Sequence, residues 1–295
     1  MANELKQLIP WARRRDMKDN EKSDGRKIPV RPPAGFYLPG LCLAIFFAFA
    51  GTLSARTAQE DIFATHAQAA YKRAQAEYWT QINNPAAACE FARTCYNWAD
   101  FATNKSELGA IAQDGIAASR RALLFTNSAA AHYYLGLNLG QLAQAETFHA
   151  LRLVHEMERE FQTAADLDEH FDFAGPKRCL GLLYRDAPGW PLSVGNRHGA
   201  LEFLQNAAAL APDDPENVLN LAETYLKWGD TTNARIQLEV LDSLWPKAQK
   251  SLVGETWEYD WYDWSRRRDA VRWKLKPAKA RGTSAGQIGL PPGTI

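Results

Sequence analysis

Histidines are the side chains of this chain with the widest scope for metal binding or acid–base catalysis, and the sequence contains six of them. His155-Glu156 begins like the zinc-binding sequence H-E-x-x-H, but Arg159 stands where the second histidine is required. His149 and His155 are six residues apart, so they lie on different faces of a helix. The histidine pattern therefore predicts no metal site.

Catalytic motifs are also missing from the sequence. It contains no G-x-S-x-G, no phosphate-binding loop and no nucleophile at a recognisable spacing from a base. Asp166 and Asp168 follow the end of a helical unit, where capping or solvation explains them. We expect a protein with no cofactor that is not an enzyme. The alternative is an enzyme whose catalytic residues are distant in sequence.

Cysteine spacing gives no metal signature and no disulfide framework. Cys89 and Cys95 fall in one predicted helix, where six residues rise about 9 Å, which is beyond the reach of a disulfide. Cys42 lies in an apolar N-terminal segment. We expect Cys89, Cys95 and Cys179 to be small buried side chains. A bridge from Cys179 to one of the other two is the alternative.

The elements that would position a binding site are helical hairpins, which recur along the chain. The clearest hairpin is marked by Leu221, Ala222, Tyr225, Gly229, Ala234, Leu238, Leu241 and Pro246. These are the offsets of a tetratricopeptide-like helix–turn–helix unit of about 34 residues. The glycine permits the turn between the two helices, and we expect the proline to end the second helix.

Four such units follow one another. Aligned on their closing positions, they end at Asn127, Glu169, Pro212 and Pro246. The two longer spacings indicate insertions between paired helices, which map to loops on one face of a stack. Because one unit cannot bury its own apolar face, the units must pack on each other. The sequence therefore predicts an all-α fold, an α-solenoid of tetratricopeptide-like hairpins.

The periodicity of apolar residues and the positions of helix-breaking residues define the individual helices. No strand signal of useful length occurs. Helices are expected at 57–81, 85–101, 106–125, 129–142, 145–167, 197–210, 215–228 and 232–244, with a further hairpin starting at Gly175-Pro176. A last helix follows Gly254 and carries Trp257, Trp261 and Trp264 on one face. We expect it to cap the stack. A sugar-stacking surface of aromatic and acidic residues is the alternative.

The N-terminal region is distinct from the repeat domain, which we assign to residues 56–275. Residues 1–34 are charged and expected to be disordered, and residues 35–55 carry no charge. The run 41–53 has the length of a signal-peptide core, and Leu53-Ser54-Ala55 resembles a cleavage site. Whether it is a signal peptide or an uncleaved anchor, it places the repeats outside the cytoplasm, in the periplasm. It is also the only expected contact with the membrane.

The C-terminal end and the charge balance complete this division. Residues 276–295 are rich in Gly, Pro, Ala and Ser and are expected to be a disordered tail. The whole chain has 34 basic and 34 acidic residues. Since nine of the basic but only five of the acidic residues precede residue 35, the rest of the chain is acidic. Nucleic acid is therefore not an expected partner.

Three segments of the repeat region are distinctive: Leu135-Gly136, LGLLYRDAPGWP at 180–191 and LNLAETYLKWGD at 219–230. They resemble the T component associated with TRAP-type transporters, and the resemblance covers roughly residues 85 to 250. It implies a periplasmic helical-repeat protein that docks on the transporter's solute-binding subunit and encloses a path for an apolar ligand. Family members are often lipoproteins, whereas Cys42 precedes most of the apolar run and is a poor acceptor for a lipid.

In such a stack the first helix of each pair lines the concave face. The positions expected to point inward are Tyr133, Leu137, Arg178, Leu182, Arg185, Glu216, Leu219, Glu223 and Leu226. Their mixed character favours an apolar or amphipathic ligand, or a partner helix. The alternative is that some of them form the core between repeats.

One further candidate lies in the insertion at 187–195. Trp190 stands between Pro188 and Pro191, and an exposed tryptophan there would be a strong anchor for a partner protein. We expect instead that Trp190 fills the space between two repeats. Together these features predict an auxiliary subunit that docks a solute-binding protein and accommodates an apolar ligand. The alternative is an envelope scaffold with no role in transport.

Overall fold

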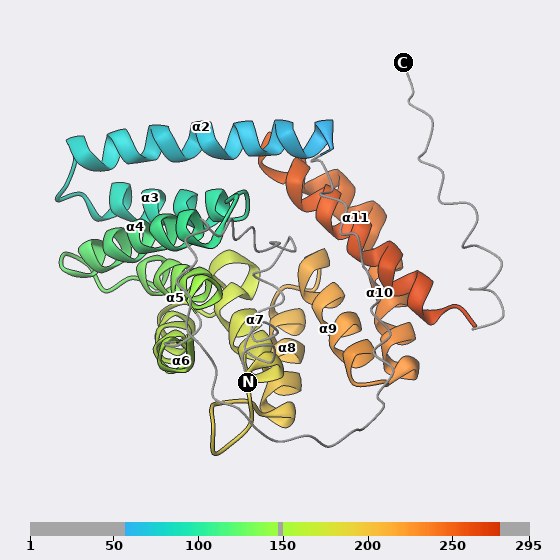
Figure 1. The fold of residues 1–295 in the computed structure, drawn as a ribbon. Coiled ribbons are helices and arrows are strands. Elements are labelled where there is room, and N and C mark those ends of the chain that lie inside the picture. The colour runs from blue at the N-terminus through green and yellow to red at the C-terminus, as the bar shows by residue number, and fades with distance from the viewer. Residues whose placement is uncertain (1–56, 147–149, 278–295) are drawn as a thin grey trace, which may run out of the picture.

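Ten helices follow one another in the computed structural model, which describes residues 57–146 and 150–277 (Figure 1). They are α2 (Ala58–Thr80), α3 (Pro85–Ala99), α4 (Lys105–Leu123), α5 (Ala129–Ala145), α6 (Ala150–Leu167), α7 (Phe171–Asp186), α8 (Arg197–Leu210), α9 (Pro215–Lys227), α10 (Thr231–Ser251) and α11 (Glu255–Leu275). Within these two ranges the chain forms no strand beyond one isolated bridge between Gly189 and Gly195. The predicted all-α fold is confirmed.

Short polar side chains fix where most helices begin. The residue before the helix accepts a hydrogen bond from a backbone N–H of the first turn, which satisfies a donor that has no partner inside the helix. The residues that do so are Thr57, Asn84, Asn104, Ser128, Asn196, Asp214 and Asp230. These caps explain why the predicted helix starts at 85, 129, 197 and 215 are those observed.

Consecutive helices pack against each other in chain order, and the first helices of the hairpins form a row. In this row α3 contacts α5, α5 contacts α7, and α7 contacts α9. The hairpin α5–α6 is tight because Gly136 faces Phe161, and a Cβ atom at residue 136 would lie 2.5 Å from that ring. The core is consequently a series of apolar clusters between neighbouring hairpins, as expected for a solenoid.

The last helix continues this row beyond α9 and also contacts α10. Trp264 is buried, and Trp257 and Trp261 pack on the cluster formed by α8, α9 and α10. Ring centroids of Trp245 and Trp261 lie 5.0 Å apart in an edge-to-face arrangement. The prediction of a C-terminal capping helix is confirmed.

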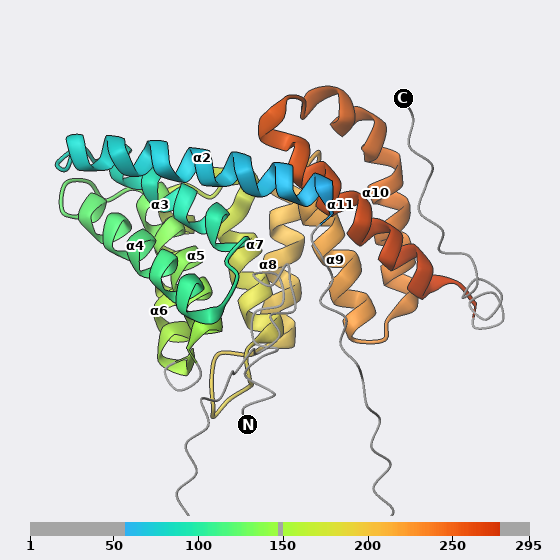
Figure 2. The same cartoon turned by 45° about the horizontal axis from the view of Figure 1, so that its top comes forward.

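The N-terminal end of α11 also reaches α2, as the two views of the fold show (Figures 1 and 2). Phe63 of α2 packs against Tyr259 and Tyr262 of α11, with ring centroids 5.2 and 5.5 Å apart. His66 and Glu255 add an ion pair of 3.2 Å. The first and last helices that the structure describes therefore touch, and the curved row of helices closes on itself at this point.

The prediction that Pro246 ends its helix was wrong. Helix α10 continues to Ser251, and Pro246 lies inside it. An internal proline removes one backbone hydrogen bond and costs about 3 kcal/mol in an isolated helix. Here the helix continues because Trp245 and Ala248, on either side of the proline, are buried in the cluster that contains α11. Tertiary packing outweighs the local preference.

Two predicted helix starts were also imprecise. The helix expected at 145–167 begins at Ala150, and Ala145 is the last residue of α5. Helix α7 begins at Phe171, but Asp172, Phe173 and Ala174 have left-handed φ values of 50°, 56° and 61°. Right-handed helical geometry starts again only at Gly175, which is where the sequence placed the start.

Several predictions fall on residues that the structure does not describe. The charged region 1–34, the leader at 35–55 and almost all of the tail at 276–295 lie outside the described ranges. Among the helices that are described, none combines the length and the apolar character needed to cross a bilayer.

Candidate functional site

The apolar residues predicted to line a concave groove are buried between the helices instead. Tyr133, Leu137, Leu182 and Leu219 are each no more than 3% exposed, and Leu226 packs on the cluster around α9 and α10. These five residues therefore belong to the core between repeats. This is the alternative stated above, in which such residues form the core between repeats rather than a free groove.

The two predicted arginines form ion pairs within the stack. The Arg178 guanidinium lies 3.3 Å from a carboxylate oxygen of Asp172 and of Asp214, and it donates to Asn217 over 3.2 Å. Arg185 pairs with Asp186 at 2.7 Å and donates to Thr224 Oγ1 over 3.1 Å. Both guanidinium groups are buried and serve to join α7 to α9.

The remaining predicted residues, Glu216 and Glu223, are bound by the chain's own last helix. Arg267 of α11 donates to both carboxylates over 2.7 to 2.9 Å. It also donates to Asn220 Oδ1 over 2.7 Å, and Trp264 Nε1 donates to Glu216 over 2.6 Å. Helix α11 therefore covers the surface of α9 that we expected to face a ligand or a partner helix.

The carboxylates around Arg267 stabilise the positive charge of its guanidinium group. Burial opposes the charge on Arg267, but Glu216, Glu223 and Asp263 outweigh it and raise the pKa of the guanidinium well above its usual value. The nearby Asp214 behaves differently. Burial raises the pKa of its carboxyl to about 7, although the Arg178 cation opposes this shift.

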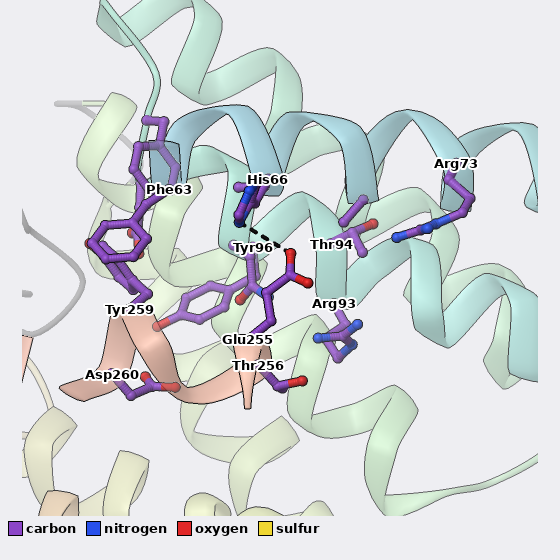
Figure 3. Close-up of a pocket in the computed structure, with 15 residues that line it drawn as sticks. Phe63, His66, Arg73, Arg93, Thr94, Tyr96, Glu255, Thr256, Tyr259 and Asp260 are labelled. Carbon is purple, nitrogen blue, oxygen red and sulfur yellow. Dashed lines mark ion pairs between the residues drawn. The ribbon is translucent and has the colours of Figure 1, made fainter. Parts of the chain in front are cut away.

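A cavity of about 430 Å³ lies between α2, α3 and α11, beside the contact that closes the row (Figure 3). Phe63, Phe101 and Tyr259 form an aromatic wall, and Ala67 and Ala70 of α2 extend it. Arg73, Arg93 and Thr94 bring polar groups to the lining from α2 and α3. The volume falls within the range of small-molecule sites, about 300–1,000 Å³.

The two arginines of the cavity differ in how they are held. Arg93 is fixed by Glu90, which accepts from its Nε over 2.8 Å and from its Nη2 over 2.5 Å. Arg73 is exposed and forms no ion pair with any residue in the described part of the chain. One guanidinium is therefore preorganised, and the other is available.

Trp190 does not fill the space between two repeats, so that expectation was wrong. Its side chain is 89% exposed, at the tip of the loop between α7 and α8. The base of this loop is closed by a hydrogen bond from Gly195 N to Pro188 O of 2.8 Å. A Cβ at residue 195 would lie 2.1 Å from Ala187 O, so only glycine fits there. The loop presents Trp190 and the exposed Leu192 to solvent.

Side chains that could bind a metal ion are not clustered in the part of the chain that the structure describes. Among the described residues, no three His, Cys, Asp or Glu side chains are placed to hold a metal ion. Cys89, Cys95 and Cys179 are free thiols; Cys95 and Cys179 are buried as expected, whereas Cys89 is only partly buried. Burial raises the pKa of all three, to about 12 for Cys179. They are therefore protonated at neutral pH.

Sequence reasoning missed the residues that define the cavity and the covered face. The sequence placed Arg267 and Tyr259 within the predicted last helix and Phe63 within the predicted helix at 57–81, with no role in a site for any of them. The repeat register places helices relative to their neighbours along the chain, but it does not show that α2 and α11 meet. The sequence feature that could have indicated this contact was the presence of aromatic residues near both ends of the repeat domain.

Comparison with known proteins assigns no family. The chain matches no protein-family model and no curated protein.

Proposed function

We propose that this protein is a non-catalytic, extracytoplasmic binding protein that docks on the solute-binding protein of a TRAP-type transporter. The observation that carries the proposal is the exposed loop at 187–195. It projects Trp190 from the stack within LGLLYRDAPGWP, one of the segments that resemble the T component of these transporters.

The chemistry of the loop suits protein recognition. A tryptophan buries a large area on binding and loses little conformational entropy. Leu192 extends the apolar tip, and the hydrogen bond between Gly195 and Pro188 holds the loop in a defined shape. Preorganisation of this kind lowers the entropic cost of association. The loop therefore supports docking better than the filled face of α9 does.

A capture experiment tests the docking proposal. The full chain is immobilised, and capture of the solute-binding protein of a TRAP-type transporter is measured for the wild type and for Trp190→Ala. Removing a central tryptophan anchor is expected to weaken binding at least about tenfold. Helicity measured by circular dichroism stays unchanged, because the side chain is 89% exposed.

Trp79 provides a matched control, since it is also largely exposed but lies on α2. Trp79→Ala is expected to leave capture unchanged. Equal capture by the wild type and both variants would contradict a docking role for the loop. Loss of helicity in Trp190→Ala would show instead that the tryptophan supports the fold.

An envelope scaffold with no transport role is the second candidate. It is favoured by the lining of the cavity, which carries charged side chains rather than forming an apolar channel. The two candidates differ in their genetic setting and in their partner. Genes for a solute-binding protein and a membrane permease next to this gene support the transporter role, and their absence together with failed capture supports the scaffold.

A further inference from the structure

The cavity between α2, α3 and α11 has two chemically different ends. Figure 3 shows Phe63 and Tyr259 on one side, and Arg73 and Arg93 on the other, with Thr94 beside the arginines. An aromatic wall offers favourable burial to an apolar or aromatic group. Two guanidinium groups and a hydroxyl offer hydrogen-bond donors to an anion.

The arginine end is equipped for a carboxylate. Glu90 engages Nε and Nη2 of Arg93, which leaves Nη1 without a bond to that carboxylate. Arg73 has no ion-pair partner within the described ranges, so an anion placed there does not have to displace an existing carboxylate. Charge-assisted bonds from planar guanidinium groups are among the strongest hydrogen bonds in proteins.

Three acidic side chains also line the cavity, and they favour one orientation of the ligand. Asp100 accepts a hydrogen bond from Gln141 over 3.2 Å, and Glu255 pairs with His66. Asp260 lies on the Tyr259 side, away from Arg73 (Figure 3). An anionic group is therefore repelled from the α11 side and attracted to the opposite end.

The pair of His66 and Glu255 bridges α2 and α11 at the cavity. Both side chains are largely exposed, and they interact over a single contact of 3.2 Å. Exposed ion pairs contribute little to stability, because water screens them. A ligand can therefore enter past this pair without a large energetic cost.

We propose that the cavity binds a small amphipathic carboxylate, whose aromatic or apolar body packs on Phe63 and Tyr259 and whose carboxylate is bound by Arg73 and Arg93. The site is formed by both ends of the row of helices, so the ligand joins α2 to α11. This inference rests on the proposed binding function, since it names the ligand class of a protein that we take to be non-catalytic.

Calorimetric titration of the full-length chain tests the inference with a matched pair of probes, indole-3-propionate and indole-3-propionamide. Both probes carry the same ring, and only the first carries a charge. The carboxylate is expected to bind at least about tenfold more tightly than the amide, because the arginine end discriminates by charge. Arg73→Gln is expected to abolish this preference while leaving the weak binding of the amide unchanged.

Two further variants locate the site. Ala70→Leu adds volume to the aromatic side and is expected to weaken binding of both probes, since Ala70 lines the cavity. Arg152→Gln removes an exposed arginine from α6, which does not line the cavity, and should change neither titration. Circular dichroism confirms that each variant is folded.

Two results would overturn the inference: no binding of the carboxylate at about 1 mM, or equal affinity for the acid and the amide in the wild type. A preference that survives Arg73→Gln would overturn the placement of the carboxylate. The titration uses the chain alone, so it is independent of docking. Capture of the solute-binding protein without acid binding would refute only the ligand, and acid binding without capture would refute only the docking partner.

Discussion

At the scale of single residues, buried charges are placed in groups rather than in isolated pairs. Arg267 interacts with Glu216, Glu223 and Asp263. Removing one partner from a buried group leaves the others uncompensated, which costs more than the pair itself contributes. The free energy of unfolding should therefore fall markedly when the cation between α9 and α11 is removed.

Arg267→Met tests this dependence. The variant keeps an apolar stem of similar length but removes the cation that pairs with Glu216 and Glu223, so the free energy of unfolding should fall by about 3–5 kcal/mol. Urea denaturation followed by circular dichroism measures the change. Arg266→Met is the matched control, because Arg266 is 57% exposed and pairs with Asp263 at the edge of the same group. It should cost less than about 1 kcal/mol. Equal losses in the two variants would show that α11 does not cover α9 as described.

Asp214 predicts a distinct dependence of stability on pH. Its carboxyl has a pKa of about 7 in the folded chain, because burial disfavours its charge, against about 3.9 in an unfolded chain. Between these values the folded state holds a proton that the unfolded state has released. The contribution of Asp214 to stability is therefore greatest below about pH 4 and is lost as the pH rises through 7.

Comparison of the wild type with Asp214→Asn isolates this effect. Asparagine preserves the hydrogen-bond acceptor that caps α9 but does not titrate. The stability of the wild type relative to the variant should decrease between pH 5 and pH 8, as measured by urea denaturation at each pH. A constant difference, or one that changes in the opposite direction, would exclude a proton on the folded Asp214 in this range.

Residue types could be predicted from the sequence, but their partners could not. The repeat pattern placed four charged residues on the inner row of helices, namely Arg178, Arg185, Glu216 and Glu223. It could not show that Arg267 reaches Glu216, since these residues are far apart in the sequence and belong to no common repeat. The charged positions were therefore interpreted as a free surface, although the chain itself satisfies them.

At the scale of elements, hairpin packing depends on small residues at a few points of close approach. A Cβ atom at Gly181 would lie 2.6 Å from Leu204 Cγ and 3.0 Å from the backbone oxygen of Ala200. At Gly109, also inside a helix, the nearest atom would be Ala145 Cβ at 3.4 Å. The two glycines therefore differ in surroundings although both are helical.

Alanine substitutions at these two glycines should have opposite effects. Gly181→Ala should destabilise the fold by about 1–3 kcal/mol, because a backbone oxygen on α8 cannot move aside easily. Gly109→Ala should stabilise it by about 0.5–1 kcal/mol, because alanine loses less conformational entropy in a helix. Thermal and urea unfolding measure both changes. Destabilisation of similar size in both variants would contradict the predicted register of α7 on α8.

Helix boundaries were predictable where a local signal fixed them. Asn196 and Asp214 cap their helices through side-chain hydrogen bonds, and such caps can be recognised in a sequence. The left-handed turn at 172–174 could not be predicted from the sequence, because its conformation depends on residues that are distant along the chain. Tyr133 donates to Asp172 over 2.6 Å, and Asn217 donates to Phe173 O over 2.9 Å.

At the scale of the whole molecule, the decisive feature is that the row of helices closes. Each hairpin packs on its neighbour, and this serial order follows from the repeat pattern. The contact between α2 and α11 does not follow from it, since it depends on the accumulated curvature of the entire stack. This contact forms one wall of the cavity and completes its aromatic side.

The ligand proposal and the docking proposal concern different parts of this molecule. The cavity lies between α2, α3 and α11, whereas Trp190 lies on the loop between α7 and α8. A ligand that joins α2 to α11 would stabilise the closed form through mass action. The two functions can therefore be tested separately.

A double-mutant cycle between Phe63 and Tyr259 tests this closure most directly. The two residues belong to the first and last described helices, and their ring centroids lie 5.2 Å apart. The free energy of unfolding is measured for the wild type, Phe63→Leu, Tyr259→Leu and the double variant. A closed row predicts a coupling energy of about 0.5–1.5 kcal/mol between the two rings. Strictly additive effects of the two substitutions would show that α2 and α11 do not meet, and would contradict the cavity between them.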